Sequence, residues 1–461
     1  MTDAHFMRFA LRLARRGYGT TSPNPMVGAV LVKGGKVIGR GWHRRAGGPH
    51  AEIEALRDAQ KHGHNPRGAT LYVTLEPCCT QGRTPPCTDA IIAAGIKRVV
   101  IGATDPNPEH AGRAFKILRR AGIAVESFGV PRLRGKSHTS RPNRLKAELQ
   151  TLADECKQLN EAFNHWIVHR TPFATVKAAM TLDGKIATAS GESKWITGEK
   201  ARACGMKLRH GADAILVGIN TILADDPRLT VRGQRSEVRG QKQLRRVVLD
   251  SMARTPLNAK VVSDEHAALT TVVVSQRAPQ SRVAALAKRV KALVAPTVKH
   301  PSPVTRHSSL DLHWLLNKLG SGDVTSLLVE GGGEVNASFL LGGLAHRVVF
   351  FYAPKILGGR DSRKAVGGEG AKRLDEVIKL HDIKWRRLGA DLLLTARMSP
   401  QRRLGRAAHP EDRMAALSRV AATNCACNFQ HSTHKMGACL PVLSKKRGSS
   451  SRSSRRPGRS N

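Results

Sequence analysis

The sequence is poor in aromatic residues and has no long apolar run. Aromatic residues make up 4% of the 461 positions, so any hydrophobic core must be largely aliphatic. No stretch approaches the ~20 consecutive apolar residues that a membrane-spanning helix needs. Residues 1–17 are amphipathic and lack an apolar core of signal-peptide length. We therefore expect a cytoplasmic protein with no membrane partner.

Cysteine is scarce and shows no pairing pattern. The chain has 8 cysteines, and their positions do not suggest the disulfide framework of a small secreted domain. In the cytoplasm, cysteine spacing indicates metal binding or catalysis before it indicates disulfides.

Acidic residues are also few, with 35 Asp and Glu against 76 Lys and Arg, a formal charge of +41. Much of this excess lies in low-complexity segments. Residues 399–461 contain 13 basic and 2 acidic residues, residues 131–146 contain 6 basic and no acidic residues, and residues 232–246 contain 6 basic and 1 acidic residue. The rest is only moderately basic, which fits a pocket for a phosphorylated small molecule better than a nucleic-acid partner.

The length and the 40% apolar content predict two domains. Strand and helix patterns alternate over residues 1–130, which indicates an α/β sandwich. The expected strands are 26–32, 37–42, 69–75 and 97–102, and the expected helices are 3–17, 50–61 and a segment opened by Pro85 and Pro86.

A basic linker or insertion is expected over residues 131–151, and a second α/β domain over 152–398. That domain should begin with a helix over 152–167. Its expected strands are 174–178, 214–217, 246–249, 270–274, 326–329, 347–352 and 391–396. Residues 399–461 lose all periodicity and should form a disordered basic tail.

The first domain carries the pattern His50-Ala51-Glu52, Pro77-Cys78 and Cys87. Imidazole and thiolate are zinc ligands, and a catalytic zinc site keeps a fourth position for water. Bound zinc makes hydroxide available near neutral pH, and Glu52 could move the protons. The His-x-Glu and Pro-Cys elements match the zinc deaminases of nucleobases, although eight residues rather than two separate the cysteines here.

The alternative is a purely structural role, as a surface histidine and buried thiols. The combination of His-x-Glu at a helix start with Pro-Cys after a strand argues against it. Two adjacent cysteines rarely both bind one tetrahedral ion, so Cys79 is the alternative to Cys78, and Pro77-Cys78 fits the deaminase pattern better.

In the second domain, residues 329–333 read VEGGG between an expected strand and an expected helix. Such a loop lets backbone N–H groups approach a phosphate at a helix start, although a triple glycine can equally be a plain turn. Arg209 and Arg232 could pair with a substrate phosphate, or be solvated surface charges. Asp225 and Asp226 could bind a ligand or cap a turn.

Longer motifs carry a family resemblance. In the first domain they are TSPNPMVG (21–28), PHAE (49–52), TLEPCCTQGRTPPC (74–87) and DPNP (105–108). In the second they are KAAMTLDGK (177–185), SGESKWIT (190–197), LADDPRLTVR (223–232), LDS (249–251) and VEGGG (329–333). Over about residues 1–130 and 152–397 the chain resembles the RibD family of bifunctional riboflavin-biosynthesis enzymes. The eight-residue gap between the cysteines is that family's form.

The resemblance implies a cytidine-deaminase-like three-layer sandwich followed by a dihydrofolate-reductase-like α/β domain. It implies two cofactors, Zn²⁺ and NADPH. The implied reactions are removal of an amino group from 2,5-diamino-6-(5-phosphoribosylamino)pyrimidin-4(3H)-one, then reduction of the ribosyl group to ribityl phosphate. We expect a homo-oligomer that acts on this small phosphorylated pyrimidine without a nucleic-acid partner.

The resemblance also implies site residues. The implied zinc ligands are His50, Cys78 and Cys87, with Glu52 as the catalytic acid and base. The implied NADPH contacts are Ala179, Trp195, Thr221, Asp225, Ser251, Gly332, Gly333, Glu334, Val335, Asn336, Ala337 and Ser338. The implied substrate contacts are Ser193, Arg209, Leu229, Arg232 and Glu330, with Lys177 in the same pocket.

One departure from the family concerns the residues after the first cysteine ligand. The family has Ser-His there, whereas this chain has Cys79 and Thr80. A histidine at that place could hold substrate, so turnover could differ.

Two other functions are conceivable. One is a zinc deaminase that edits nucleic acid with a non-catalytic second domain, and the other is a deaminase whose reductase domain only mediates assembly. A glycine-rich dinucleotide loop argues against the first, and NADPH binding would exclude the second. Cys425, Cys427, His431 and His434 lack any helix or strand frame, and we expect no second metal site there.

Overall fold

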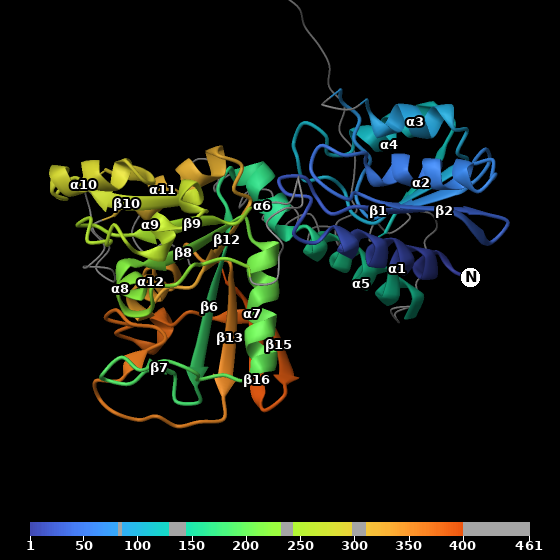
Figure 1. The fold of residues 1–461 in the computed structure, drawn as a ribbon. Helices are drawn as coiled ribbons and strands as arrows, with labels where there is room; N and C mark the ends of the chain where they lie inside the picture. The colour runs from blue at the N-terminus through green and yellow to red at the C-terminus, as the bar shows by residue number, and fades with distance from the viewer. Residues whose placement is uncertain (82–84, 129–143, 232–242, 297–309, 400–461) are drawn as a thin grey trace, which may run out of the picture. The chain divides into compact units, whose positions relative to one another are not determined.

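The computed structural model describes residues 1–81, 85–128, 144–231, 243–296 and 310–399, which belong to the compact unit Met1–Gln401 (Figure 1). In this part of the chain the strands form a five-stranded sheet, a nine-stranded sheet and a small two-stranded ribbon. Each large sheet packs against its own helices, and no described helix is long and apolar enough to span a membrane.

The first sheet has the strand order β2-β1-β3-β4-β5. Its strands are β1 (Gly28–Lys33), β2 (Lys36–Trp42), β3 (Thr70–Val73), β4 (Arg98–Ile101) and β5 (Ala124–Ser127). β1 is antiparallel to β2 and β3, whereas β3, β4 and β5 are parallel. β1 and β2 form a hairpin at Gly34-Gly35, and both glycines have the positive φ that its turn requires.

Helices cover both faces of this sheet and give the expected three layers (Figure 1). The helices are α1 (Asp3–Ala14), α2 (Ala51–Lys61), α3 (Cys87–Ala93), α4 (Arg113–Arg120) and α5 (Arg144–Leu159), with a 3-10 turn, η1 (Arg15–Gly17), after α1. Successive strand residues point to opposite faces. Val30 thus packs in one cluster with residues of α1 and α5, and Leu31 packs in another with residues of α2 and α3.

The backbone of α2 lies directly on β2. A Cβ atom at Gly41 would stand 2.2 Å from the Ala51 carbonyl oxygen, and one at Gly39 would stand 2.4 Å from that of Ala55. Glycine in the strand is therefore required for the helix to pack this closely.

The second sheet has the order β11-β10-β9-β8-β12-β6-β13-β16-β15. Its strands are β6 (Phe173–Thr181), β8 (Ala214–Gly218), β9 (Arg245–Leu249), β10 (Thr270–Ser275), β11 (Lys291–Ala295), β12 (Ser326–Val329), β13 (Arg347–Ala353), β15 (Leu380–Leu388) and β16 (Asp391–Met398). The strands from β11 to β13 are parallel, and β16 and β15 add an antiparallel edge. The ribbon pairs β7 (Lys185–Ala187) with β14 (Arg363–Lys364).

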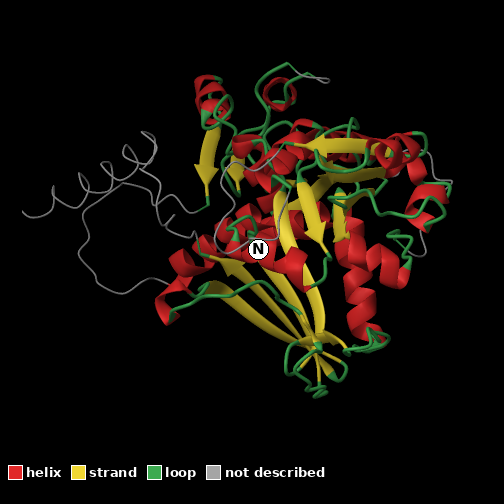
Figure 2. Ribbon diagram, turned by 90° about the vertical axis from the view of Figure 1, so that its left-hand side faces the viewer, coloured by secondary structure: helices red, strands yellow, loops and turns green. Residues whose placement is uncertain are grey.

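Helices flank this sheet as well, as the red helices beside the yellow strands in Figure 2 show. They are α6 (Glu161–His169), α7 (Glu199–Gly211), α8 (Ile219–Asp225), α9 (Lys260–Ser263), α10 (Gln280–Ala287), α11 (Leu312–Ser321) and α12 (Gly333–Leu341), with 3-10 turns η2 (Ala267–Leu269) and η3 (Leu374–Glu376). Leu216 and Val217, adjacent in β8, enter different hydrophobic clusters, so both faces of the strand are covered.

The helix expected over residues 152–167 is two helices, α5 and α6, separated at Asn160. The Asn160 side chain is buried and makes two hydrogen bonds with the Met26 backbone, accepting from its N–H at 2.8 Å and donating to its carbonyl at 2.9 Å. Leu152 and Cys156 of α5 pack in the same cluster as α1. The helix is therefore interrupted at Asn160, whose side chain bonds the backbone of the loop before β1.

A buried ion pair anchors β9. Arg246 is 1% exposed and donates two hydrogen bonds to the Asp264 carboxylate, at 2.7 and 2.8 Å. Its Nε donates to Thr270 Oγ1 at 2.8 Å. Burial raises the pKa of Asp264, but the hydrogen bonds and charge of Arg246 outweigh it and hold that pKa below its ordinary value.

Replacing Asp264 with asparagine should destabilise the fold by about 3–5 kcal/mol at pH 7, because Arg246 then stays buried without a counter-charge. The folded-state pKa is lowered, so the contribution of the pair is complete above about pH 4 and is lost as the pH falls through the folded-state pKa. Chemical denaturation at pH 7 and pH 3 should show the difference between wild type and Asp264→Asn shrinking in acid. Asp375→Asn is the matched control, because Asp375 and its partner Arg373 are both exposed and such a pair contributes about 0–1 kcal/mol. An equal effect of the two variants would contradict the assignment.

Candidate active sites

The three predicted zinc ligands come from element ends in the first half. His50 is the N-cap residue of α2, and Cys87 is the first residue of α3, as expected from the sequence. Cys78 lies in the loop after β3. Two helix starts and one loop thus deliver one side chain each.

Their ligand atoms converge. His50 Nδ1 is 3.4 Å from Cys78 Sγ and 3.3 Å from Cys87 Sγ, and all three atoms lie within 4.8 Å of one another. A tetrahedral zinc ion with bonds of about 2.3 Å to sulfur and about 2.0 Å to nitrogen needs nitrogen–sulfur separations near about 3.5 Å. The donor set and its spacing therefore fit a zinc ion, and Cys78 rather than Cys79 belongs to the group.

The thiols are electrostatically unequal. The Cys87 backbone N–H donates to Cys78 Sγ at 3.3 Å. A hydrogen bond from the Cys87 side chain lowers the pKa of Cys78, against the effect of burial, and the His50 ring adds to the lowering. The same contact raises the pKa of Cys87. One thiolate is therefore available for a cation without any change in the fold.

Glu52 lies in the first turn of α2 and is 3% exposed. Burial, with the nearby Cys78 second, raises the pKa of this carboxyl group to about 7. A group that titrates near neutrality can both accept and release a proton at physiological pH.

Glu76 is a residue whose role sequence reasoning missed. It is buried beside Pro77 and Cys78, and its carboxylate accepts backbone N–H bonds from Asp105, Gly112 and Ala114 at 3.2, 3.0 and 3.1 Å. Burial raises the pKa of Glu76, opposed by those three bonds. It ties the loop after β4 to the loop that carries Cys78. The signal in the sequence was an acidic residue at the end of an apolar strand.

The glycine-rich segment of the second half connects β12 to α12. A Cβ atom added to Gly331 would stand 2.4 Å from Val335 Cβ, and one added to Gly333 would stand 2.5 Å from the Lys364 carbonyl oxygen. At Gly332, the N-cap residue of α12, nothing lies within 4 Å of such a Cβ. The backbone is therefore open at Gly332, where a phosphate group can approach the helix start.

Other predicted cofactor residues follow neighbouring parallel strands. Thr221 and Asp225 are in α8 after β8, and Ser251 comes just after β9, so they share the carboxyl edge of the sheet with Gly332. In open parallel sheets ligands bind at this edge.

The remaining predicted cofactor positions differ in access. Trp195 is 58% exposed and stacks on Arg202, with the guanidinium carbon 4.7 Å from the ring centroid. Ala179 is half-buried in β6. Within α12, Glu334 is exposed and Val335 and Ser338 are half-buried, whereas Asn336 and Ala337 are closed to solvent. The open part of the predicted segment is therefore its beginning.

Three predicted substrate-pocket residues form one charged cluster. Arg209 donates to both oxygens of the Glu330 carboxylate, at 3.0 and 2.7 Å, and Lys177 Nζ is 3.7 Å from Glu330 Oε2. Burial raises the pKa of Glu330, but Lys177 and Arg209 outweigh it and lower that pKa to about 2. Arg209 is thus held by Glu330 instead of projecting as a solvated charge. Ser193 is half-buried, Leu229 is buried and Arg232 lies outside the described residues, as do Cys425, Cys427, His431 and His434.

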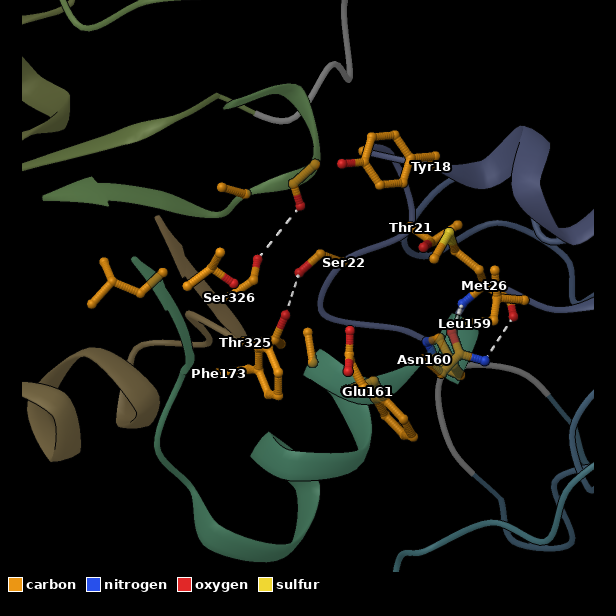
Figure 3. A pocket seen from close by; sticks show the side chains of 18 of the residues that line it. Tyr18, Thr21, Ser22, Met26, Leu159, Asn160, Glu161, Phe173, Thr325 and Ser326 are labelled. Atoms are coloured by element: carbon orange, nitrogen blue, oxygen red, sulfur yellow. Dashed lines mark hydrogen bonds between the residues drawn. The ribbon is translucent and has the colours of Figure 1, made fainter. Parts of the chain in front are cut away.

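A separate pocket is drawn in Figure 3. Its lining includes Tyr18, Ser22, Asn160, Phe173 and Thr325, and Ser22 Oγ lies 3.3 Å from Thr325 Oγ1. No predicted site residue lines it, so neither candidate reaction is assigned there.

Comparison with protein families gives a match in each half. Residues 1–103 match the cytidine and deoxycytidylate deaminase zinc-binding region, and residues 172–394 match the RibD C-terminal domain. The riboflavin biosynthesis protein RibD of Actinobacillus pleuropneumoniae is 41% identical over 394 residues, which covers 86% of this chain and 95% of that protein.

Comparison with solved structures points to the same family. Acinetobacter baumannii RibD aligns with a TM-score of 0.70 at 33% identity, covering 86% of this chain and 99% of that chain. The diaminohydroxyphosphoribosylaminopyrimidine deaminase/5-amino-6-(5-phosphoribosylamino)uracil reductase of Thermotoga maritima aligns with a TM-score of 0.67 at 34% identity, with the same coverage. With a deaminase-type metal centre in its first half and a RibD reductase domain in its second, the chain belongs to the RibD family.

Proposed function

We propose that this chain catalyses both reactions of its family. The first is deamination of 2,5-diamino-6-(5-phosphoribosylamino)pyrimidin-4(3H)-one, and the second is NADPH-dependent reduction of the ribosyl group to ribityl phosphate. The observation that carries the proposal is the convergence of His50 Nδ1 on two thiols beside buried Glu52, in a chain related to RibD over both halves.

In the deaminase centre, His50, Cys78 and Cys87 would hold zinc. When bound, zinc lowers the pKa of a water molecule to about 7 and so provides the nucleophile. Glu52 would carry one proton of the attacking water to a ring nitrogen and the second to the departing amine, so that ammonia leaves as the ring carbonyl forms. Its burial supports this role, because it brings the pKa of the carboxyl group close to neutral.

In the reductase centre, NADPH supplies the hydride when bound. The open backbone at Gly332 and the start of α12 would hold its phosphates. The other proposed cofactor contacts are Ala179, Trp195, Thr221, Asp225, Ser251, Gly333, Glu334, Val335, Asn336, Ala337 and Ser338. The proposed substrate contacts are Ser193, Arg209, Leu229, Arg232 and Glu330. The pairing of Glu330 with Arg209 and Lys177 fixes these side chains before substrate arrives, which favours orientation for hydride transfer.

We further propose that the deaminase domain extends to Leu159 and the reductase domain begins with α6. Supporting this boundary, α5 packs in the core of the first sheet. We propose that the enzyme works in the cytoplasm as a homo-oligomer. The edge strand β15 supports self-association, since it exposes Ile383 by 53% and Trp385 by 59%.

Replacing Glu52 with glutamine should lower the rate of ammonia release by about 10²-fold or more, because the amide cannot carry the proton. NADPH oxidation by the same protein, supplied with the deaminated intermediate, should persist. Glu54→Gln, two residues along α2, serves as the control and should keep ammonia release. A Glu52→Gln protein that releases ammonia at the wild-type rate would exclude the proposed acid–base role.

Metal content distinguishes the two adjacent cysteines. Cys78→Ser should lose bound zinc, because a hydroxyl replaces the thiolate that faces His50 Nδ1. Cys79→Ser should retain about one zinc per chain. Atomic absorption on the purified proteins measures both, and loss of zinc from Cys79→Ser alone would overturn the ligand assignment.

Gly332→Ala tests the phosphate site. The φ of −71° suits alanine, and the added methyl group meets no protein atom within 4 Å, so thermal stability should be unchanged. The KM for NADPH should rise by about tenfold, because the methyl group occupies the approach of the phosphates. Ammonia release by the same protein is the internal control. An unchanged KM for NADPH would place the cofactor phosphates elsewhere.

A further inference from the structure

The loop after β4 brings a histidine to the metal centre's border. His110 Nε2 lies 3.4 Å from Thr80 Oγ1, and His110 Nδ1 lies 3.9 Å from Cys79 Sγ. Cys79 and Thr80 are the two residues that follow Cys78. They are also the place where this chain lacks the Ser-His of its family.

The position of His110 is set by the same scaffold that places Cys78. Glu76, two residues before Cys78, accepts backbone N–H bonds from both ends of the loop, at Asp105 and at Gly112. The His110 backbone N–H donates to the Asn107 carbonyl at 2.9 Å, which closes the turn that carries the ring. The half-buried imidazole is therefore held on a braced turn.

A neighbouring carboxyl group links His110 to the centre. Asp105 is half-buried and is close enough to both Cys78 and His110 for its pKa to respond to each: burial raises that pKa most, His110 lowers it, and Cys78 raises it. Asp105 thus interacts electrostatically with both residues.

The contacts of the ring leave it able to bind. The contact of Nδ1 with Cys79 Sγ is long and involves a weak sulfur partner, so Nδ1 can exchange it for a hydrogen bond to substrate while Nε2 stays beside Thr80. An imidazole nitrogen can donate to a carbonyl oxygen or accept from an amino group. A threonine at position 80 is also smaller than histidine, which leaves room for a ring arriving from another loop.

We propose that His110 supplies the imidazole that this chain lacks at Thr80, and that it hydrogen-bonds a polar group of the pyrimidine ring in the deaminase centre. His110 is thus a substrate-positioning residue for deamination, held by Thr80. This inference rests on the proposed deaminase function and adds a residue to it.

The first test is His110→Ala. The KM for the diaminopyrimidine substrate should rise by about tenfold, with a smaller change in kcat, because a binding contact is removed while the zinc ligands and Glu52 remain. Zinc content and NADPH oxidation with the deaminated intermediate should equal those of the wild type. His64→Ala is the matched control, since His64 is exposed in the loop after α2.

The second test is rescue from the other loop. In the double variant His110→Ala/Thr80→His, the KM should return to within about threefold of the wild-type value, since the imidazole is restored from position 80. A structural role of His110 in bracing its own loop would not be repaired by a histidine at position 80.

A binding measurement gives a readout independent of turnover. In the Glu52→Gln background, calorimetry with the diaminopyrimidine substrate should show a Kd raised by about tenfold on adding His110→Ala. Wild-type protein that binds zinc but releases no ammonia would refute the proposed function itself. Active wild type with an unchanged His110→Ala KM, or a raised KM that Thr80→His does not restore, would overturn the role of His110 alone.

Discussion

The deaminase centre depends on the close approach of α2 to β2. Because Gly39 and Gly41 carry no side chain, the backbone of α2 at Ala51 and Ala55 can rest directly on the strand. This contact fixes where α2 begins, and therefore where His50 and Glu52 stand. The distances from His50 Nδ1 to the two thiols are short enough for one metal ion only while that contact holds.

The second half uses strand ends in the same way. Its parallel strands stop at one edge, and the residues that follow them gather there: Thr221 after β8, Ser251 after β9 and Gly332 after β12. The charged cluster around Glu330 begins one residue beyond β12. The pairing of the parallel strands sets where each strand ends. The residues that follow the strands therefore come together at this edge even when no side-chain bond joins them.

The strands, turns and helix starts could be predicted from the sequence because each depends on residues that are close together in the chain. The strands alternate or run apolar, the glycine pairs mark turns, and His50 and Cys87 stand at helix starts, so the layers and the metal ligands were predictable. Contacts that depend on tertiary distance were not. The split of one expected helix at Asn160 arises from a bond to Met26, and the roles of Glu76 and His110 arise from a loop about 30 residues away. Strand β15 was not predicted from the sequence, and its residues between the two ends are all exposed, so neither of its faces contributes to a buried core.

The two large sheets are built on one continuous chain, each with its own core. Translation of one message therefore yields both catalysts in a fixed ratio of one to one. Changes in gene dosage or in protein turnover alter the capacity of the two reactions together. A cell that makes this protein therefore cannot make the deaminase, which produces the deaminated intermediate, without also making the reductase that consumes it.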